Sequence, residues 1–318
     1  MTFDELGVSA PICRAITELG YQQPMPVQEA VIPYLLGEPI DLIALAQTGT
    51  GKTAAFGLPL LQNVAKSLEE VPATGTPRAL VLCPTRELCL QIADDLTAYS
   101  KYLPSVRILP VYGGSSIEAQ IRTLRRGVEV IVATPGRLID LMERGAASLE
   151  SISTVVLDEA DEMLTMGFAE SLQTILSQVP EERHLLLFSA TMPKEISSIA
   201  SSYMHKPKEI IVGTKNEGNK NIRHFYYVVS AKHKYLALKR IADYYPDIYG
   251  IIFCRTRKET QEIADQLIRD GYNADALHGE LSQAQRDYVM QKFRIRNLQL
   301  LVATDVAARG LDVNDLTH

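Results

Sequence analysis

One run of this 318-residue sequence has the residue types and spacing that phosphate chemistry needs. It is Ala46-Gln-Thr-Gly-Thr-Gly-Lys-Thr53, in which two glycines let the backbone turn its N–H groups inward. Lys52 can reach the β- and γ-phosphates of a nucleotide, and the Thr53 hydroxyl can hold Mg²⁺. The first position is alanine where the strict pattern has glycine. The predicted nucleotide-binding residues of this run are Thr48, Gly49, Thr50, Gly51, Lys52 and Thr53.

A second group supplies carboxylates, in Asp158-Glu-Ala-Asp161. Asp158 follows an apolar run and could hold Mg²⁺ through water, because Mg²⁺ keeps most of its hydration. Glu159 could orient and deprotonate an attacking water. Acidic residues also favour the first turn of any helix, but the phosphate-binding run upstream favours catalysis. We therefore predict a nucleotide phosphate and Mg²⁺ as ligands, with Thr53 and Asp158 as the metal-binding pair.

Short apolar runs alternate with helical patterns along the chain, which predicts an α/β fold with parallel sheets. In such sheets ligands bind beyond the carboxyl ends of the strands, where both groups above fall. The predicted strands are Leu42–Leu45, Ala79–Cys83, Val106–Val111, Val128–Ala133, Thr154–Asp158, Leu185–Ser189, Ile210–Val212, Phe225–Val229, Ile248–Cys254, Ala274–Leu277 and Leu298–Thr304.

The polar run Gly213–Asn221 has the composition of a linker and divides the chain into two predicted domains, 1–212 and 222–318. Residues 1–219 carry 17 basic and 26 acidic side chains, and residues 220–318 carry 15 and 12. Opposite net charges would help the two parts approach each other, and they restrict nucleic-acid binding to local patches.

Composition excludes several classes of protein. The sequence has no run of about 18 apolar residues and no secretory leader, so we expect no membrane contact and a cytoplasmic location. The four cysteines lack metal-ligand spacing, so we expect reduced thiols.

With these motifs in order, the chain resembles the DEAD-box RNA helicases, a family named after the sequence at 158–161. The resemblance implies two RecA-like parallel-sheet domains in tandem. Gly20–Gln28, with Phe3 upstream, resembles the family's Q motif, in which an aromatic ring packs on adenine and the glutamine amide reads its edge. Phe3, Tyr21 and Gln28 are therefore implied ATP-binding residues, and Tyr21 stands where phenylalanine is commoner.

Further short motifs resemble the family's RNA-gripping segments, which would hold the sugar–phosphate backbone and read little sequence. Alone, each is weak: Thr134-Pro135 is also a good helix start, and a lone arginine is often a solvated one. The implied RNA-binding residues are Pro84, Thr85, Arg86, Gly114, Thr134, Pro135, Gly136 and Arg137 in the first domain, and Arg257 and Thr304 in the second.

Two further motifs are implied to complete the catalytic machinery. Ser189-Ala-Thr191 resembles the segment that links ATP hydrolysis to strand separation through Asp161, and Asp312 would touch the ribose. The family continues beyond this point to an arginine-rich motif that reaches the γ-phosphate, whereas the sequence ends at His318. We therefore expect an incomplete second domain with an exposed sheet edge, and slow hydrolysis, because an arginine finger contributes about 10³–10⁵ in rate.

Three functions compete on this evidence. The first is an ATP-dependent RNA helicase that clamps RNA and separates short duplexes. The second is a nucleotide-gated RNA clamp with little turnover, and the third is a DNA helicase. The Q motif and the run at 158–161 favour the first over the third. RNA-processing or ribosome-assembly proteins are possible partners.

Overall fold

The computed structural model describes residues 1–37, 41–71, 75–212, 222–308, 313 and 315–318. The chain separates into two compact units, Met1–Gly218 and Asn219–His318. The linker predicted at 213–221 lies outside the described residues, and so does Asp312. The domain boundary therefore stays a prediction, and each unit is described by itself.

The first unit is built on a seven-stranded sheet in the order β3-β4-β2-β5-β6-β1-β7, and all its pairings are parallel. The α/β prediction is thereby confirmed for this unit. The strands are β1 (Leu42–Leu45), β2 (Ala79–Leu82), β3 (Ile108–Val111), β4 (Val130–Ala133), β5 (Thr154–Leu157), β6 (His184–Ser189) and β7 (Lys208–Ile211).

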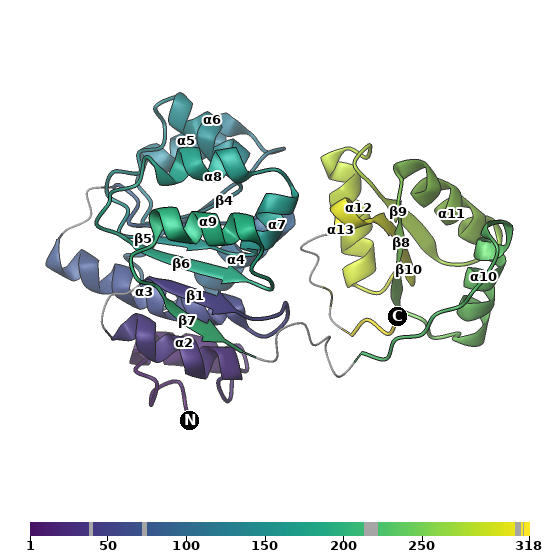
Figure 1. Cartoon of the computed structure of the whole chain (residues 1–318), viewed down its shortest axis with the longest axis horizontal. Coiled ribbons are helices and arrows are strands. Elements are labelled where there is room, and N and C mark those ends of the chain that lie inside the picture. The colour runs from purple at the N-terminus through teal and green to yellow at the C-terminus, as the bar shows by residue number, and fades with distance from the viewer. Residues whose placement is uncertain (38–40, 72–74, 213–221, 309–312, 314) are drawn as a thin grey trace. The chain divides into compact units, whose positions relative to one another are not determined.

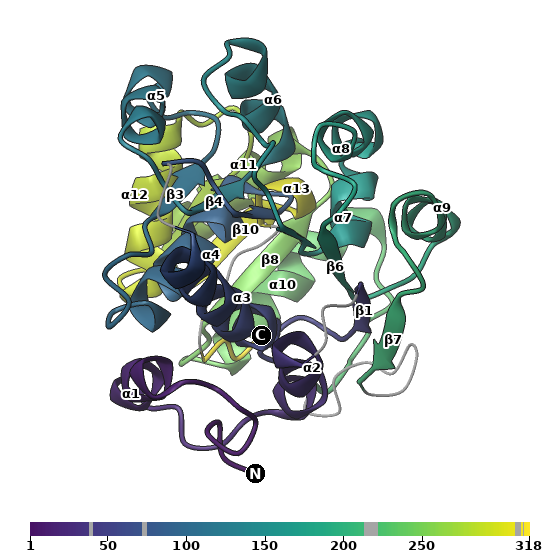
Figure 2. The same cartoon turned by 90° about the vertical axis from the view of Figure 1, so that its left-hand side faces the viewer.

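Helices cover both faces of this sheet (Figures 1 and 2). One layer contains α1 (Ala10–Glu18), α2 (Pro26–Leu36), α3 (Lys52–Glu70) and α4 (Arg86–Tyr99). The other contains α5 (Ile117–Arg125), α6 (Pro135–Glu143), α7 (Ala160–Thr165), α8 (Ala169–Leu176) and α9 (Lys194–Tyr203). Successive strand residues point to opposite layers, so Ala44 joins the first core and Leu45 the second. This double burial explains why the strands read as continuous apolar runs.

The second unit carries a parallel sheet of three strands in the order β8-β10-β9. These strands are β8 (Gly250–Cys254), β9 (Ala274–Leu277) and β10 (Leu300–Thr304). The helices around them are η1 (Ala231–His233), α10 (Lys234–Tyr244), α11 (Arg257–Arg269), α12 (Gln283–Arg294) and α13 (Asp305–Ala308). Two hydrophobic clusters again lie on the two faces of the sheet. Among the described residues, every helix is too short or too polar to span a bilayer.

One predicted strand is wrong. Residues 225–229 belong to no strand or helix, and Tyr226 and Val228 are 89% and 91% exposed. Aromatic and β-branched residues favour a pleated surface, but a strand also needs an edge to pair with, which local pattern cannot supply. Four other strands, β3, β4, β8 and β10, begin two residues later than predicted. In β3 and β8 the reason is a turn, because the N–H groups of Val106 and Ile248 donate to the carbonyls of Leu103 and Tyr245.

Candidate functional site

The sheet order gathers the predicted catalytic motifs at one edge. Strands β5, β6 and β1 are neighbours, with Leu45 opposite Ser189 and Leu157 opposite Leu187. Because these strands are parallel, their carboxyl ends face the same way. The phosphate-binding loop, the carboxylates after β5 and the 189–191 segment therefore meet there. The N–H of Ala46 donates to the carbonyl of Ser189 at 3.0 Å, which ties two of these segments together.

The backbone of the predicted phosphate-binding loop turns at its two glycines. Gly49 and Gly51 have φ angles of 77° and 86°, and Gly51 caps the N-terminus of α3. A Cβ atom on Gly51 would lie 2.5 Å from Gln28 Nε2 and 2.9 Å from Met25 Sδ, so only glycine fits. The Thr50 hydroxyl donates to the carbonyl of Gln47 at 2.7 Å, which closes the turn. Thr48 and Gly49 are exposed at the tip of this loop.

Lys52 is the first residue of α3, and its side chain is buried. Its Nζ has no hydrogen-bond partner among the described residues. A buried ammonium costs free energy unless an anion compensates it. The positive charge of Lys52 acts on the neighbouring carboxyl groups of Asp158 and Glu159, where it opposes the rise in pKa that burial causes. The Lys52 ammonium therefore has unused hydrogen-bond donors beside the Gly49–Gly51 turn, among the described residues.

The carboxylates after β5 are shaped by burial. Asp158 is 3% exposed, and desolvation raises its pKa while Lys52 opposes that rise. Desolvation, followed by the charge of Asp158, raises the pKa of Glu159 to about 7. Glu159 also adopts a left-handed backbone with φ 50°, which is costly for a residue other than glycine. Strain and a shifted pKa at one residue are typical of functional sites.

Asp161 joins the carboxylate segment to the end of β6. Its Oδ2 accepts from the N–H of Thr191 at 2.9 Å and from the Thr191 hydroxyl at 2.7 Å. The buried Ser189 hydroxyl donates to the carbonyl of Thr191 at 2.7 Å and accepts from the N–H of Asp161 at 3.3 Å. The three residues that the motifs single out are thus one hydrogen-bonded unit.

The predicted adenine-recognition residues lie beside the loop. Gln28 is 1% exposed, its Nε2 donates to the Gly51 carbonyl at 3.1 Å, and its Oε1 accepts from the Met25 N–H at 2.8 Å. Phe3 is 5% exposed and packs 6.2 Å from Tyr21 between ring centroids. The Tyr21 and Tyr99 hydroxyls share a hydrogen bond of 2.9 Å. Both ends of the Gln28 amide therefore have partners within the chain, and adenine reading stays a prediction.

The predicted RNA-binding residues of the first unit share the other half of the same sheet edge. Strands β2, β4 and β3 are neighbours, and α4, α6 and α5 begin where these strands end. Thr85 caps α4 by accepting from the N–H of Leu88 at 3.2 Å, and Arg86 lies over the Tyr112 ring at 4.8 Å. Pro84 and Pro135 are buried, whereas Gly114, with φ 84°, and Gly136 are exposed. Thr134 is the N-cap residue of α6.

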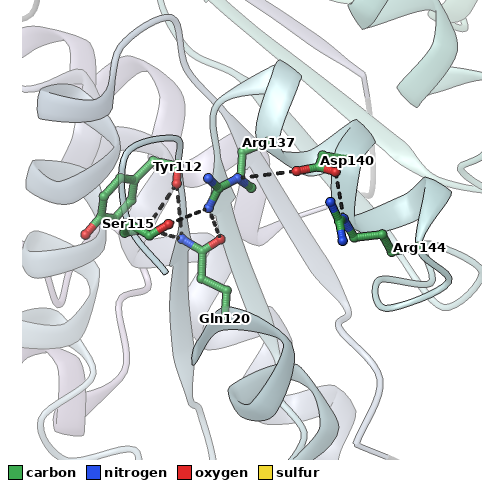
Figure 3. A network of polar contacts seen from close by, with 6 residues as sticks. All are labelled: Tyr112, Ser115, Gln120, Arg137, Asp140 and Arg144. Carbon is green, nitrogen blue, oxygen red and sulfur yellow. Dashed lines mark hydrogen bonds and ion pairs between the residues drawn. The ribbon is translucent and has the colours of Figure 1, made fainter. Parts of the chain in front are cut away.

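Arg137 belongs to a polar network that sequence patterns did not reveal (Figure 3). Its Nη1 donates to the Ser115 carbonyl at 3.1 Å and to Gln120 Oε1 at 3.0 Å. Its Nε lies 3.8 Å from Asp140, which also accepts from Arg144 at 2.8 Å. Gln120 carries no motif signal, since its partners come from other segments of the chain.

The two described RNA-binding candidates of the second unit lie at the carboxyl ends of two neighbouring strands, β10 and β8. Thr304 closes β10 and is 7% exposed, and its hydroxyl accepts from the N–H of Ala307 at 3.2 Å. Arg257 begins α11, just after β8, and donates to Glu280 at 3.1 Å between exposed side chains. Thr304 thus caps a helix, whereas the Arg257 guanidinium is open to solvent.

A glycine-rich loop before a helix, paired carboxylates and a linked Ser-x-Thr segment at the ends of parallel strands are the arrangement expected of a phosphate-loop NTPase of the helicase type. The family profile described as "DEAD/DEAH box helicase" matches residues 25–199, and "Helicase conserved C-terminal domain" matches residues 233–318. The chain belongs to the DEAD/DEAH box helicase family. The resemblance inferred from the motifs is thereby confirmed.

Named relatives agree with this assignment. The chain is 46% identical over 317 residues to the "DEAD-box ATP-dependent RNA helicase CshA" of Geobacillus kaustophilus, covering 100% of this chain and 66% of that protein. It is 44% identical over 316 residues to the "ATP-dependent RNA helicase DeaD" of Escherichia coli, covering 99% and 49%. The chain therefore spans about half to two thirds of the length of these relatives.

A solved structure with 30% identity, S. cerevisiae Dbp5 bound to RNA and ADP BeF3, matches with a TM-score of 0.87. It covers 99% of this chain and 78% of that one. A DEAD box protein from Methanococcus jannaschii matches with 38% identity and a TM-score of 0.60, covering 99% and 83%. These neighbours confirm the predicted RecA-like fold class.

Proposed function

We propose that this chain is the core of an ATP-dependent RNA helicase. The observation that carries the proposal is the buried Lys52 ammonium, which lacks a hydrogen-bond partner among the described residues at the mouth of the Gly49–Gly51 turn. An anion at that point would compensate the buried charge and could also accept from the backbone N–H groups at the start of α3. The triphosphate of ATP has the required charge and shape.

The residues present also fit a magnesium ion. The Thr53 hydroxyl and the Asp158 carboxylate are hard oxygen donors of the kind that Mg²⁺ prefers. A bound magnesium ion would neutralise charge on the phosphate oxygens. Glu159, with a pKa near 7, is matched to accept a proton from water near neutral pH. Lys52 would hold the transferred phosphoryl group through the same charge that now lies buried.

RNA binding by the first unit is supported by three helix starts at one sheet edge. The helices α4, α5 and α6 begin at Arg86, Ile117 and Pro135, and helix N-termini favour phosphate. Contacts of this kind read the backbone rather than the sequence. The relatives CshA and DeaD are named RNA helicases, and the Dbp5 structure contains RNA.

Coupling between the carboxylates after β5 and the segment after β6 falls to Asp161. Its carboxylate binds Thr191 twice, and its own N–H binds Ser189, so movement of the catalytic carboxylates is transmitted to the end of β6. We infer that the binding of ATP and RNA strains the link between Asp161 and Thr191, and that hydrolysis of ATP releases the strain. Arg257, Thr304 and Asp312 of the second unit would complete the RNA and ribose contacts. RNA-processing partners and a cytoplasmic location stay predictions.

The test is the steady-state ATPase rate of the 318-residue chain with single-stranded RNA, with DNA of the same sequence, and without nucleic acid. RNA-specific stimulation that is lost in Lys52→Ala is the expected result. Equal stimulation by DNA would favour a DNA helicase. RNA-dependent binding of ATP without turnover would favour the clamp. Unchanged rates in Lys52→Ala would overturn the proposal.

A further inference from the structure

Gln120 on α5 is a buried polar side chain, 6% exposed, whose amide is used at both ends. Its Nε2 donates to the Ser115 hydroxyl at 2.7 Å and to the Tyr112 carbonyl at 3.2 Å. Its Oε1 accepts from Arg137 Nη1 at 3.0 Å. Figure 3 shows the amide lying between the turn that carries Tyr112 and the guanidinium of Arg137.

The network closes on itself. Arg137 Nη1 also donates to the Ser115 carbonyl, and the Ser115 hydroxyl donates to the Tyr112 carbonyl at 3.2 Å. The planar amide can donate to a carbonyl and accept from a guanidinium at the same time, which an ionised carboxylate cannot. A carboxylate would keep the arginine but would repel the Tyr112 carbonyl. An apolar side chain would remove the hydrogen bond between Gln120 and each of them, so that the turn and Arg137 would be joined only through Ser115.

The segments that this amide joins are those at which RNA binding is proposed. The turn between Tyr112 and Ser116 exposes Gly113 and Gly114, and Arg86 of the preceding helix lies over the Tyr112 ring at 4.8 Å. Arg137 belongs to the first turn of α6. Gln120 therefore contacts the glycine turn and the start of α6 directly. It is linked to the start of α4 through Tyr112, whose ring lies under Arg86.

We propose that Gln120 is a positioning residue for RNA binding, which holds the glycine turn and the Arg137 guanidinium at a fixed spacing. This inference rests on the proposed RNA-binding function. Gln120 is too buried to touch RNA itself. Backbone phosphates along a strand have a regular spacing, so groups that contact successive phosphates must be held at a matching distance. A loosened turn would cost RNA affinity without altering the nucleotide site.

The experiment compares Gln120→Glu with a matched substitution, Gln62→Glu. Gln62 on α3 also uses both ends of its amide, accepting from the Ser9 N–H at 2.7 Å and donating to the Gly7 carbonyl at 3.1 Å. Both changes put a carboxylate opposite a carbonyl, but Gln62 is remote from the predicted RNA segments. Affinity for a fluorescent single-stranded RNA is measured by anisotropy with a non-hydrolysable ATP analogue, beside analogue affinity and melting temperature.

In Gln120→Glu we expect RNA affinity to fall about tenfold, with analogue affinity within twofold of the original chain. In ATPase assays the RNA concentration for half-maximal stimulation should rise while the rate at saturating RNA holds. Gln62→Glu should lower the melting temperature alone. Ser115→Ala, a change on the turn itself that removes one hydroxyl, should weaken RNA binding about threefold, and it serves as the test if Gln120→Glu does not fold.

The outcomes separate the two proposals. If the original chain binds RNA and both Gln120→Glu and Ser115→Ala bind it equally well, the positioning role is wrong and RNA binding stands. The positioning role is also wrong if Gln62→Glu weakens RNA binding as much as Gln120→Glu, because a general loss of stability would then explain both. If the original chain does not bind RNA, both proposals fail together.

Discussion

Thr191 is bound to Asp161 through a single carboxylate oxygen, which accepts from both its backbone N–H at 2.9 Å and its hydroxyl at 2.7 Å. Asp161 stands after β5 and Thr191 after β6, so the pair bridges the ends of neighbouring strands. The double contact fixes where the 189–191 segment lies relative to the catalytic carboxylates. Such a bridge can carry a change at one segment to the other.

Thr191→Val removes the hydroxyl donor and keeps the shape and the backbone contact. Because hydrogen bonds to charged groups contribute about 1.5–3 kcal/mol, we expect RNA duplex separation to slow by about tenfold or more. The ATPase rate should fall by no more than about threefold, because the Thr191 hydroxyl binds Asp161 and Thr191 is not among the predicted nucleotide-binding residues. Thr174→Val on α8, where the hydroxyl donates to the Glu170 carbonyl, is the matched control. Equal losses of hydrolysis and separation would contradict a coupling role.

Replacement by alanine should cost different amounts of stability at the two loop glycines. Gly49 and Gly51 both have positive φ, but a Cβ on Gly49 meets nothing within 4 Å, whereas one on Gly51 collides with Gln28 and Met25. We expect Gly49→Ala to cost about 1 kcal/mol from backbone strain alone. Gly51→Ala should cost about 1–3 kcal/mol more, because the neighbouring side chains must shift. Urea unfolding measures the difference, and equal costs would show that the Gln28 contact is loose.

Asp41 is a residue that sequence patterns missed. It is 5% exposed, and its two oxygens accept from the N–H of Leu185 at 2.7 Å and of His205 at 2.6 Å. Asp41→Asn turns one acceptor into a donor and faces it with a buried N–H, so unfolding free energy should fall by about 2 kcal/mol or more. Asp140→Asn, at a half-exposed carboxylate, should cost under about 1 kcal/mol in the same denaturation assay. A small effect at both positions would refute this assignment.

The fold and the catalytic motifs were predictable because their signals are local. Leu42–Leu45 is a continuous apolar run followed at once by its glycine loop, and neighbours in sequence fix both. Asp41 was not predictable, since its partners Leu185 and His205 are distant along the chain. Gln120 was not predictable because its partners come from a turn and from a second helix, whose approach depends on the fold rather than on a local pattern. The strand predicted at 225–229 is wrong because its local pattern suits a strand, whereas a strand also needs a partner from a distant part of the chain.

The free energy of unfolding should depend on pH through the partly buried carboxyl group of Glu159. Its pKa of about 7 in the folded chain lies above the ordinary 4.5, so the folded state holds this proton more tightly than the unfolded state does. The stabilising contribution is full below about pH 4.5 and is lost as pH rises through 7. Allowing for partial exposure, we expect a loss of about 1–2 kcal/mol across that window.

Glu159→Gln removes the titration while keeping the side-chain shape. The variant should melt at a temperature similar to that of the original chain at pH 5 and several degrees higher at pH 8, because only the original chain must then bury a charge beside Asp158. Glu170→Gln, at an exposed carboxyl on α8, should leave the pH profile of melting unchanged. Parallel profiles for Glu159→Gln and the original chain would mean that the Glu159 carboxylate is already solvated, and its role as a base tuned by burial would have to be abandoned.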